Sequence, residues 1–132
     1  MRQDMIDVGM EYFKNSPILG IGIGGSAVIT KSEYGVEMYL HNNFVELLAC
    51  GGIVGFTCYY AIFAYILINL IKMTLAKDDS AYLPLSMILT TLVTSVATMT
   101  YYDKIVYIYL VYFFLVVKKW KNKKEDLNLK LQ

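Results

Sequence analysis

One histidine and one arginine occur in the 132-residue chain, at His41 and Arg2. A neutral imidazole can take the proton of a hydroxyl group near pH 7 and so act as a general base. A guanidinium group is planar and permanently charged, and it can hold a diphosphate through paired hydrogen bonds that lysine cannot form. From the residues alone, simpler roles are more frequent. His41 could be a histidine at the membrane surface that satisfies backbone groups, and Arg2 could be a solvated charge near the chain start.

His41 directly precedes a segment that is typical of a helix start, residues 42–46. We expect Asn43 to be the N-cap, with Glu46 three residues later completing a capping box. The positive end of the helix dipole would then disfavour the imidazolium form of His41, which suits a general base. Glu46 is expected to stay solvated near the membrane surface, where it could orient His41 or serve only as a cap.

Two glycine patterns have structural interpretations. Gly20, Gly22 and Gly25 spell G-x-G-x-x-G, but no strand precedes them and no long amphipathic helix follows. The pattern therefore predicts a flexible turn rather than a nucleotide site. Gly51 and Gly55 form a G-x-x-x-G pattern, which predicts the close approach of another helix.

The composition places the chain in the membrane class, with 57% hydrophobic and 17% charged residues and a formal net charge of +1. This charge provides no basic face for phosphates, so we expect no nucleic-acid partner. A bilayer core requires about 20 residues of helix, and three stretches lack charged residues: 47–71, 80–102 and 105–117. The sequence thus predicts an all-α membrane protein with three transmembrane helices in a region spanning 44–117, at about 44–71, 81–100 and 102–117, the third being short.

Lysines concentrate in the C-terminal segment 118–132. Because cytoplasmic flanks of membrane helices are enriched in lysine and arginine, we expect a basic cytoplasmic tail. Counting back three crossings places residues 1–43 outside the membrane as an extracytoplasmic segment.

The segment 1–43 is predicted to contain a short amphipathic helix. Apolar residues recur at helical spacing at Ile6, Met10 and Phe13. Pro17 must end this helix, because the residue before a proline is disfavoured in the helical region. The apolar face is expected to rest on the membrane or on other helices.

Four segments, taken in order, match the pattern of a known family: Arg2, 17–24 (PILGIGIG), 41–48 (HNNFVELL) and 51–55 (GGIVG). They resemble the family of O-antigen ligases and O-antigen or capsular polysaccharide polymerases. In that family an arginine opens an external amphipathic helix, and a P-x-x-G-x-G turn follows. A His-Asn pair then leads into a transmembrane helix that carries a glutamate and a small-residue stretch. The resemblance covers residues 2–60.

The resemblance implies an inverting glycosyltransferase that needs no metal or cofactor, in the bacterial cytoplasmic (inner) membrane. It would move a glycan from undecaprenyl diphosphate to an acceptor glycan hydroxyl at the outer leaflet. His41 would take the proton of that hydroxyl, and Arg2 would stabilise the departing diphosphate. Asn42 and Glu46 would bind or position the acceptor or the histidine. The membrane lipid, the lipid-linked donor and the acceptor glycan are the expected partners.

Members of this family have many more transmembrane helices, so the chain is expected to be the C-terminal part of a larger polytopic bundle. Three spans cannot readily enclose both substrates without exposing polar backbone to lipid, so we expect the chain to need N-terminal helices or a partner membrane chain. The alternative is a small polytopic helper subunit without catalysis, which should tolerate His41→Ala and Arg2→Lys. The residues do not distinguish a ligase from a polymerase.

Overall fold

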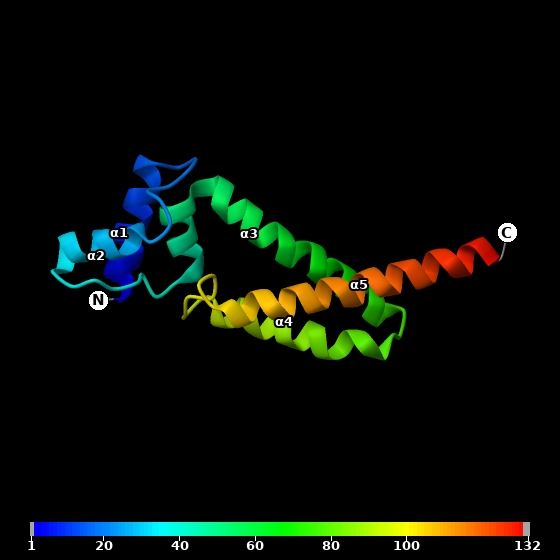
Figure 1. Cartoon of the computed structure of the whole chain (residues 1–132). Coiled ribbons are helices and arrows are strands. Elements are labelled where there is room, and N and C mark those ends of the chain that lie inside the picture. The colour runs from blue at the N-terminus through cyan, green and yellow to red at the C-terminus, as the bar shows by residue number, and fades with distance from the viewer. Residues whose placement is uncertain (1, 131–132) are drawn as a thin grey trace. The chain divides into compact units, whose positions relative to one another are not determined.

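The computed structural model describes residues 2–130, except for the side chains of Arg2 and Asn128. The described residues form helices and no strand, as the sequence predicts (Figure 1). In chain order the elements are α1 (Arg2–Asn15), α2 (Gly25–Tyr34), α3 (Asn43–Leu75), a short 3-10 helix (Asp79–Ala81), α4 (Tyr82–Thr94) and α5 (Lys104–Lys130).

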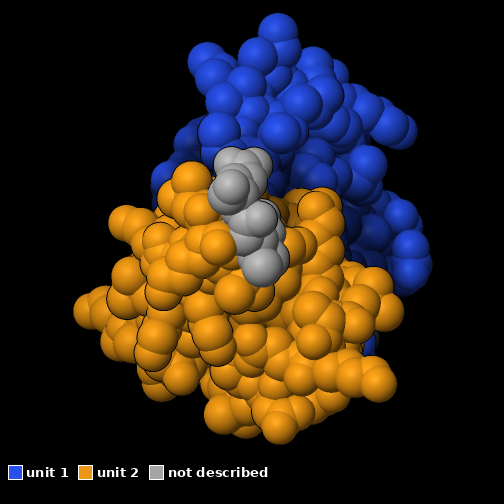
Figure 2. All heavy atoms as spheres, turned by 90° about the vertical axis from the view of Figure 1, so that its right-hand side faces the viewer, with its two compact units in different colours: residues 1–61, 91–102 blue, residues 62–90, 103–132 orange. Residues whose placement is uncertain are grey.

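The chain divides into two compact units (Figure 2). Unit 1 comprises residues 1–61 and 91–102, and it contains α1, α2 and the first part of α3. Unit 2 comprises residues 62–90 and 103–132, and it contains the rest of α3, most of α4 and α5.

The predicted amphipathic helix is α1, which ends at Asn15, before Pro17. Its apolar face packs on other parts of unit 1 through a core made of Met5, Leu40, Val45 and Ala49, with Ile6, Met10, Tyr34 and Met38 around it. Gly9 permits this close packing, because a Cβ at Gly9 would lie 2.6 Å from a methyl group of Leu40. The apolar spacing of α1 thus produces a helix whose buried side faces protein.

The helix α2 follows the glycine-rich turn, where the sequence indicated no long helix. Gly24 precedes it with φ 83°, and Gly35 ends it with φ 74°. The Gly35 amide donates a hydrogen bond to the Lys31 carbonyl, which is a common way to end a helix with a left-handed glycine. Glycine suits both ends because a side chain is disfavoured at these φ values.

The helix α3 begins at Asn43, close to the predicted start, but it is broken at Gly52, where φ is 60° and ψ is −165°. Such a break frees carbonyl and amide groups that an unbroken helix would pair with each other. The loop 17–22 supplies replacements on both sides of the break. Ile21 N and Gly22 N donate to the carbonyls of Ala49 and Cys50 at 3.0 and 2.9 Å, and Ile53 N and Val54 N donate to the carbonyls of Pro17 and Ile18 at 2.9 and 3.2 Å.

The glycine-rich loop therefore meets α3 at Gly52, which lies next to Gly51 of the G-x-x-x-G pattern. A Cβ at Gly52 would collide with the Ile18 backbone, and a Cβ at Gly20 would lie 2.5 Å from the Cys50 carbonyl carbon. A Cβ at Gly55, in contrast, would meet no atom of the described residues within 4 Å. The close approach expected from the glycines of α3 is made by a loop at Gly52 instead of by a helix across the G-x-x-x-G pattern.

Unit 2 is built on a seam between α3 and α5. Buried side chains recur every three or four residues on each helix, at Phe63, Ile66, Leu70 and Met73 and at Val106, Leu110, Phe113 and Val117. The two helices contact each other through the rings of Tyr65 and Phe114, whose centroids lie 5.9 Å apart. This spacing is the one by which two helices bury a shared apolar stripe.

Among the described helices, α3 is long and apolar enough to cross a membrane. Large apolar side chains on it are exposed, including Ile53, Ile62 and Ile68, which fits contact with lipid better than the core of a soluble domain. The helix α4 ends at Thr94, before the predicted position 100, and α5 continues to Lys130 through the basic tail. The chain is thus an all-α protein with one candidate membrane-crossing helix.

Candidate functional site at the start of α3

His41 lies immediately before the helix α3 and its side chain is exposed. Its φ of 52° places the backbone in the left-handed region, where non-glycine residues are uncommon. The imidazole makes no hydrogen bond to the described residues and is accessible to solvent. Left-handed backbone at a non-glycine residue persists when surrounding contacts hold it, and it clusters at functional sites.

Asn42 is the residue that caps α3. Its Oδ1 accepts hydrogen bonds from the amides of Phe44 and Val45 at 3.0 and 3.2 Å. The prediction that Asn43 is the N-cap was therefore wrong by one residue. Either asparagine can cap a helix by its local chemistry, and the choice is decided by a long-range partner of Asn43.

Asn43 is fully buried and joins the start of α3 to the segment after α4. Its Oδ1 accepts from the amides of Thr100 and Tyr101 at 2.9 and 3.0 Å, and its Nδ2 donates to the Tyr60 hydroxyl at 2.9 Å. Its own amide donates to the Ser95 carbonyl at 2.9 Å. Asn43 thus holds the segment after α4 at both ends, through the Ser95 carbonyl and through the amides of Thr100 and Tyr101.

Glu46 is fully buried, so the expectation that it stays solvated was wrong. It also does not form the capping box: its Oε2 accepts from the Leu40 amide at 2.9 Å. Its Oε1 accepts from the Cys50 thiol at 3.8 Å and from the Tyr101 hydroxyl at 3.5 Å. A buried carboxylate requires such donors, and here they come from three segments of unit 1.

Tyr101 is a hydroxyl donor in this cluster. Burial raises its pKa well above the ordinary value for tyrosine, and contact with Tyr102 and the charge of Glu46 raise it further. The hydroxyl therefore stays protonated across the physiological range and remains able to donate to the Glu46 carboxylate.

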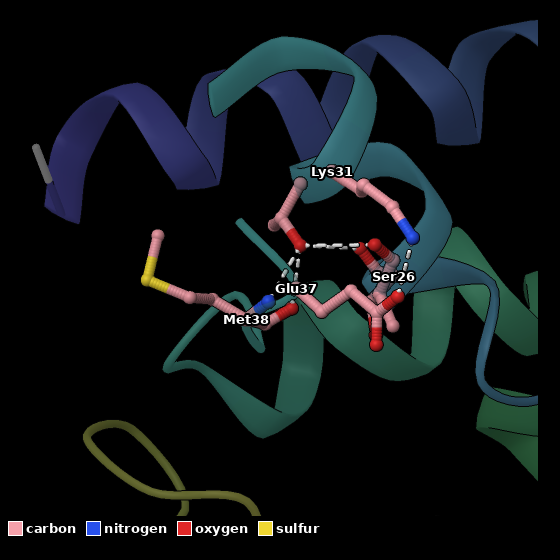
Figure 3. A network of polar contacts seen from close by, with 6 residues as sticks. Ser26, Lys31, Glu37 and Met38 are labelled. Atoms are coloured by element: carbon pink, nitrogen blue, oxygen red, sulfur yellow. Dashed lines mark hydrogen bonds and ion pairs between the residues drawn. The ribbon is translucent and has the colours of Figure 1, made fainter. Parts of the chain in front are cut away.

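The segment that leads into His41 is also held by α2 (Figure 3). The Thr30 hydroxyl accepts a hydrogen bond from the Met38 amide at 2.8 Å, and it lies 2.8 Å from the Met38 carbonyl. Beside it, Lys31 and Glu37 form an exposed ion pair of 2.9 Å. Together with the bond from Leu40 to Glu46, these contacts fix the chain before His41 at several points.

Arg2, the other residue expected to take part in catalysis, begins α1. Its side chain lies outside the described residues, so the pairing of Arg2 with His41 stays a prediction. The structure places His41, Asn42 and Glu46 at the N-terminus of α3. Asn42 caps the helix, and Glu46 holds the preceding segment through its hydrogen bond with the Leu40 amide.

The sequence analysis gave Asn43 only a capping role, and it missed Tyr101 as a member of this site and the break at Gly52. A Gly-Gly pair within a long apolar helix is a signal for a break, and it could have indicated the break at Gly52. No local signal marks the partners of Asn43, because Thr100 and Tyr101 lie far from it in the sequence.

The chain was compared with known proteins, and no family model, no curated protein and no solved structure matches it.

Proposed function

We propose that the chain carries the general base of a glycosyltransferase that acts on a lipid diphosphate-linked glycan at a membrane surface, as the resemblance to O-antigen ligases and polysaccharide polymerases implies. The observation that carries the proposal is the state of His41: an exposed imidazole, held in a left-handed conformation, next to the start of a helix that is able to cross a membrane.

In the proposed reaction His41 takes the proton of an acceptor sugar hydroxyl. The hydroxyl oxygen forms a bond to the anomeric carbon of the donor glycan, on the face opposite the leaving group. The bond from that carbon to the diphosphate oxygen breaks, and undecaprenyl diphosphate leaves with the electron pair. Arg2 meets the charge that develops on the leaving group.

Asn42 and Glu46 act in this proposal as positioning residues. Asn42 fixes the first turn of α3 beside His41 by capping it. Glu46 fixes the preceding segment through Leu40. A base that is held in this way loses little freedom when the acceptor binds, which favours reaction.

We further propose that the site is completed by additional membrane helices, in a three-span arrangement with the C-terminus in the cytoplasm. Additional helices are supported by the exposed apolar side chains in the loop before α2, namely Ile18, Leu19 and Ile23. The cytoplasmic C-terminus is supported by the lysines concentrated in residues 118–132. Exposed apolar side chains that are close together in the sequence are typical of surfaces that another protein or lipid covers.

The test is glycan transfer in proteoliposomes that contain the chain, its membrane partner helices and a labelled undecaprenyl diphosphate-linked glycan. We expect His41→Ala to lower the rate by about 100-fold or more, and Arg2→Lys to lower it strongly. Lys14→Gln is the matched control, because it removes a charge from the other end of α1, and it should leave transfer unchanged. Transfer that survives His41→Ala at the wild-type rate would show that the proposal is wrong.

The second candidate is a helper subunit without catalysis, and the same exposed apolar side chains favour it. In that case His41→Ala and Arg2→Lys should leave activity of the assembled complex intact. Replacing Ile18 and Leu19 by serine should instead release the chain from its partner, which co-purification measures.

A further inference from the structure

The second compact unit contains a groove between the ends of α3 and α5. Its volume is about 350 Å³, and it is lined by Asn69, Lys72, Trp120, Lys121, Lys124 and Glu125. Three ammonium groups therefore face one carboxylate, and the groove carries a positive charge. Its walls come from two helices that pack along the seam described above, so its shape is set by the fold of this unit.

Aromatic rings hold two of the lysines. Lys121 Nζ lies 4.9 Å from the centroid of the Tyr65 ring and donates to the Tyr65 hydroxyl at 3.2 Å. Lys124 Nζ lies 5.4 Å from the centroid of the Trp120 ring. Contacts of this kind position an ammonium group without neutralising its charge. The positions of Lys121 and Lys124 are thus restrained while both side chains keep their charge.

On both helices, exposed apolar side chains come shortly before the groove residues in the chain. On α3 the exposed Ile71 directly precedes Lys72, and on α5 the exposed Leu115 comes shortly before the first lysine, Lys118. If α3 crosses a bilayer, Lys72 and the groove are at the level of the lipid headgroups. A tryptophan side chain such as Trp120 is favoured at that level, because its ring is apolar and its N–H is polar.

We propose that this groove binds the phosphate headgroup of an anionic phospholipid. Lys72, Lys121 and Lys124 attract the phosphate, and the exposed apolar surfaces of α3 and α5 accept the acyl chains. A free phosphate ion offers the same charge but has no acyl chains to cover these surfaces, which is why a lipid is the occupant. Basic groups at the headgroup level each add to the attraction for anionic lipids.

Trp120 is the only tryptophan in the chain, so all tryptophan fluorescence comes from a side chain that lines the groove. The full chain is reconstituted into vesicles of phosphatidylcholine and phosphatidylglycerol, with bromine on the acyl chains of one lipid at a time. Bromine quenches tryptophan at short range. We expect brominated phosphatidylglycerol to quench Trp120 more than brominated phosphatidylcholine at the same mole fraction, with a preference that falls at high salt.

Lysine variants test which charges carry the preference. Replacing Lys72, Lys121 and Lys124 by glutamine should abolish it, with each replacement lowering the relative affinity by up to about fivefold. Replacing Lys14, Lys31 and Lys104 by glutamine removes the same number of charges elsewhere and should leave the preference unchanged. Glu125→Gln should increase it. Circular dichroism verifies that each variant keeps its helices.

Three outcomes would overturn the proposal. Equal quenching by the two brominated lipids in the wild-type chain would show no selectivity, and this result does not depend on the folding of any variant. An equal effect of both triple variants would assign the preference to net charge instead of the groove. Displacement of the lipid by inorganic phosphate, when chloride at the same ionic strength has no effect, would identify free phosphate as the ligand.

Discussion

The carboxylate of Glu46 accepts a hydrogen bond from the amide of Leu40, with Oε2 and N 2.9 Å apart. This bond joins the first turns of α3 to the residue next to His41 in the chain. Leu40 is itself fully buried in the core of the first unit. The geometry of the exposed histidine therefore depends on a carboxylate that solvent does not reach.

Glu46→Ala leaves the buried Leu40 amide without its acceptor, and we expect a loss of about 1–3 kcal/mol in the free energy of unfolding. Glu46→Gln keeps an acceptor oxygen and should be less damaging. Hydrogen exchange of the Leu40 amide, followed by mass spectrometry in detergent, should be faster in the alanine variant than in the glutamine variant. The same exchange rate in both variants would argue against this bond.

Gly52→Ala places a side chain at a φ of 60° and against the backbone of Ile18. We expect a loss of stability of about 2 kcal/mol or more, because the strain and the collision add. Gly55→Ala is the matched control: it lies on the same helix in open space, where alanine favours the helix. The thermal midpoint in detergent should fall for the first variant and stay or rise for the second. A reversed order would contradict the described break in α3.

His41→Gly relieves the left-handed conformation of the histidine and removes the proposed base. We expect the chain to be as stable as wild type or more stable, by up to about 1 kcal/mol, while glycan transfer is lost. Lys77 has a similar φ of 58°, so Lys77→Gly should have the same effect on stability without an effect on transfer. Loss of transfer that accompanies loss of stability in His41→Gly would indicate a structural role for the imidazole instead.

The ion pair of Lys31 and Glu37 should make the stability of the protein depend on pH. The hydrogen bond and the charge of Lys31 lower the pKa of Glu37, and those of Glu37 raise the pKa of Lys31. The contribution of Glu37 to stability is thus present above its ordinary pKa and is lost as pH falls through the lowered one. The contribution of Lys31 is present below its ordinary pKa and is lost as pH rises through the raised one.

Carbon NMR of the Glu37 carboxyl group measures this effect. Lys31→Gln should return the pKa of Glu37 toward the ordinary value of 4.5, and added salt should do the same in part. Lys14→Gln is the control and should leave the titration of Glu37 unchanged. A titration of Glu37 that does not respond to Lys31→Gln would show that the pair is absent in solution.

The sequence by itself determined the helical class and the places where local chemistry starts or stops a helix. Pro17 limits α1 because the residue before proline is restricted, and an asparagine caps α3 because its side chain reaches the free amides of the first turn. The long apolar run predicted a helix able to cross a membrane, because its composition and length are local properties.

Only the tertiary structure decided which asparagine caps α3, that Glu46 is buried, and that α3 breaks at Gly52. Each outcome depends on a hydrogen-bonding partner that is distant in the sequence: Thr100 and Tyr101 for Asn43, Tyr101 for Glu46, and the loop 17–22 for the broken helix. Periodicity and capping rules report on neighbours within a few residues. A buried polar group takes whichever donors and acceptors the folded chain brings to it, and a linear pattern does not encode that choice.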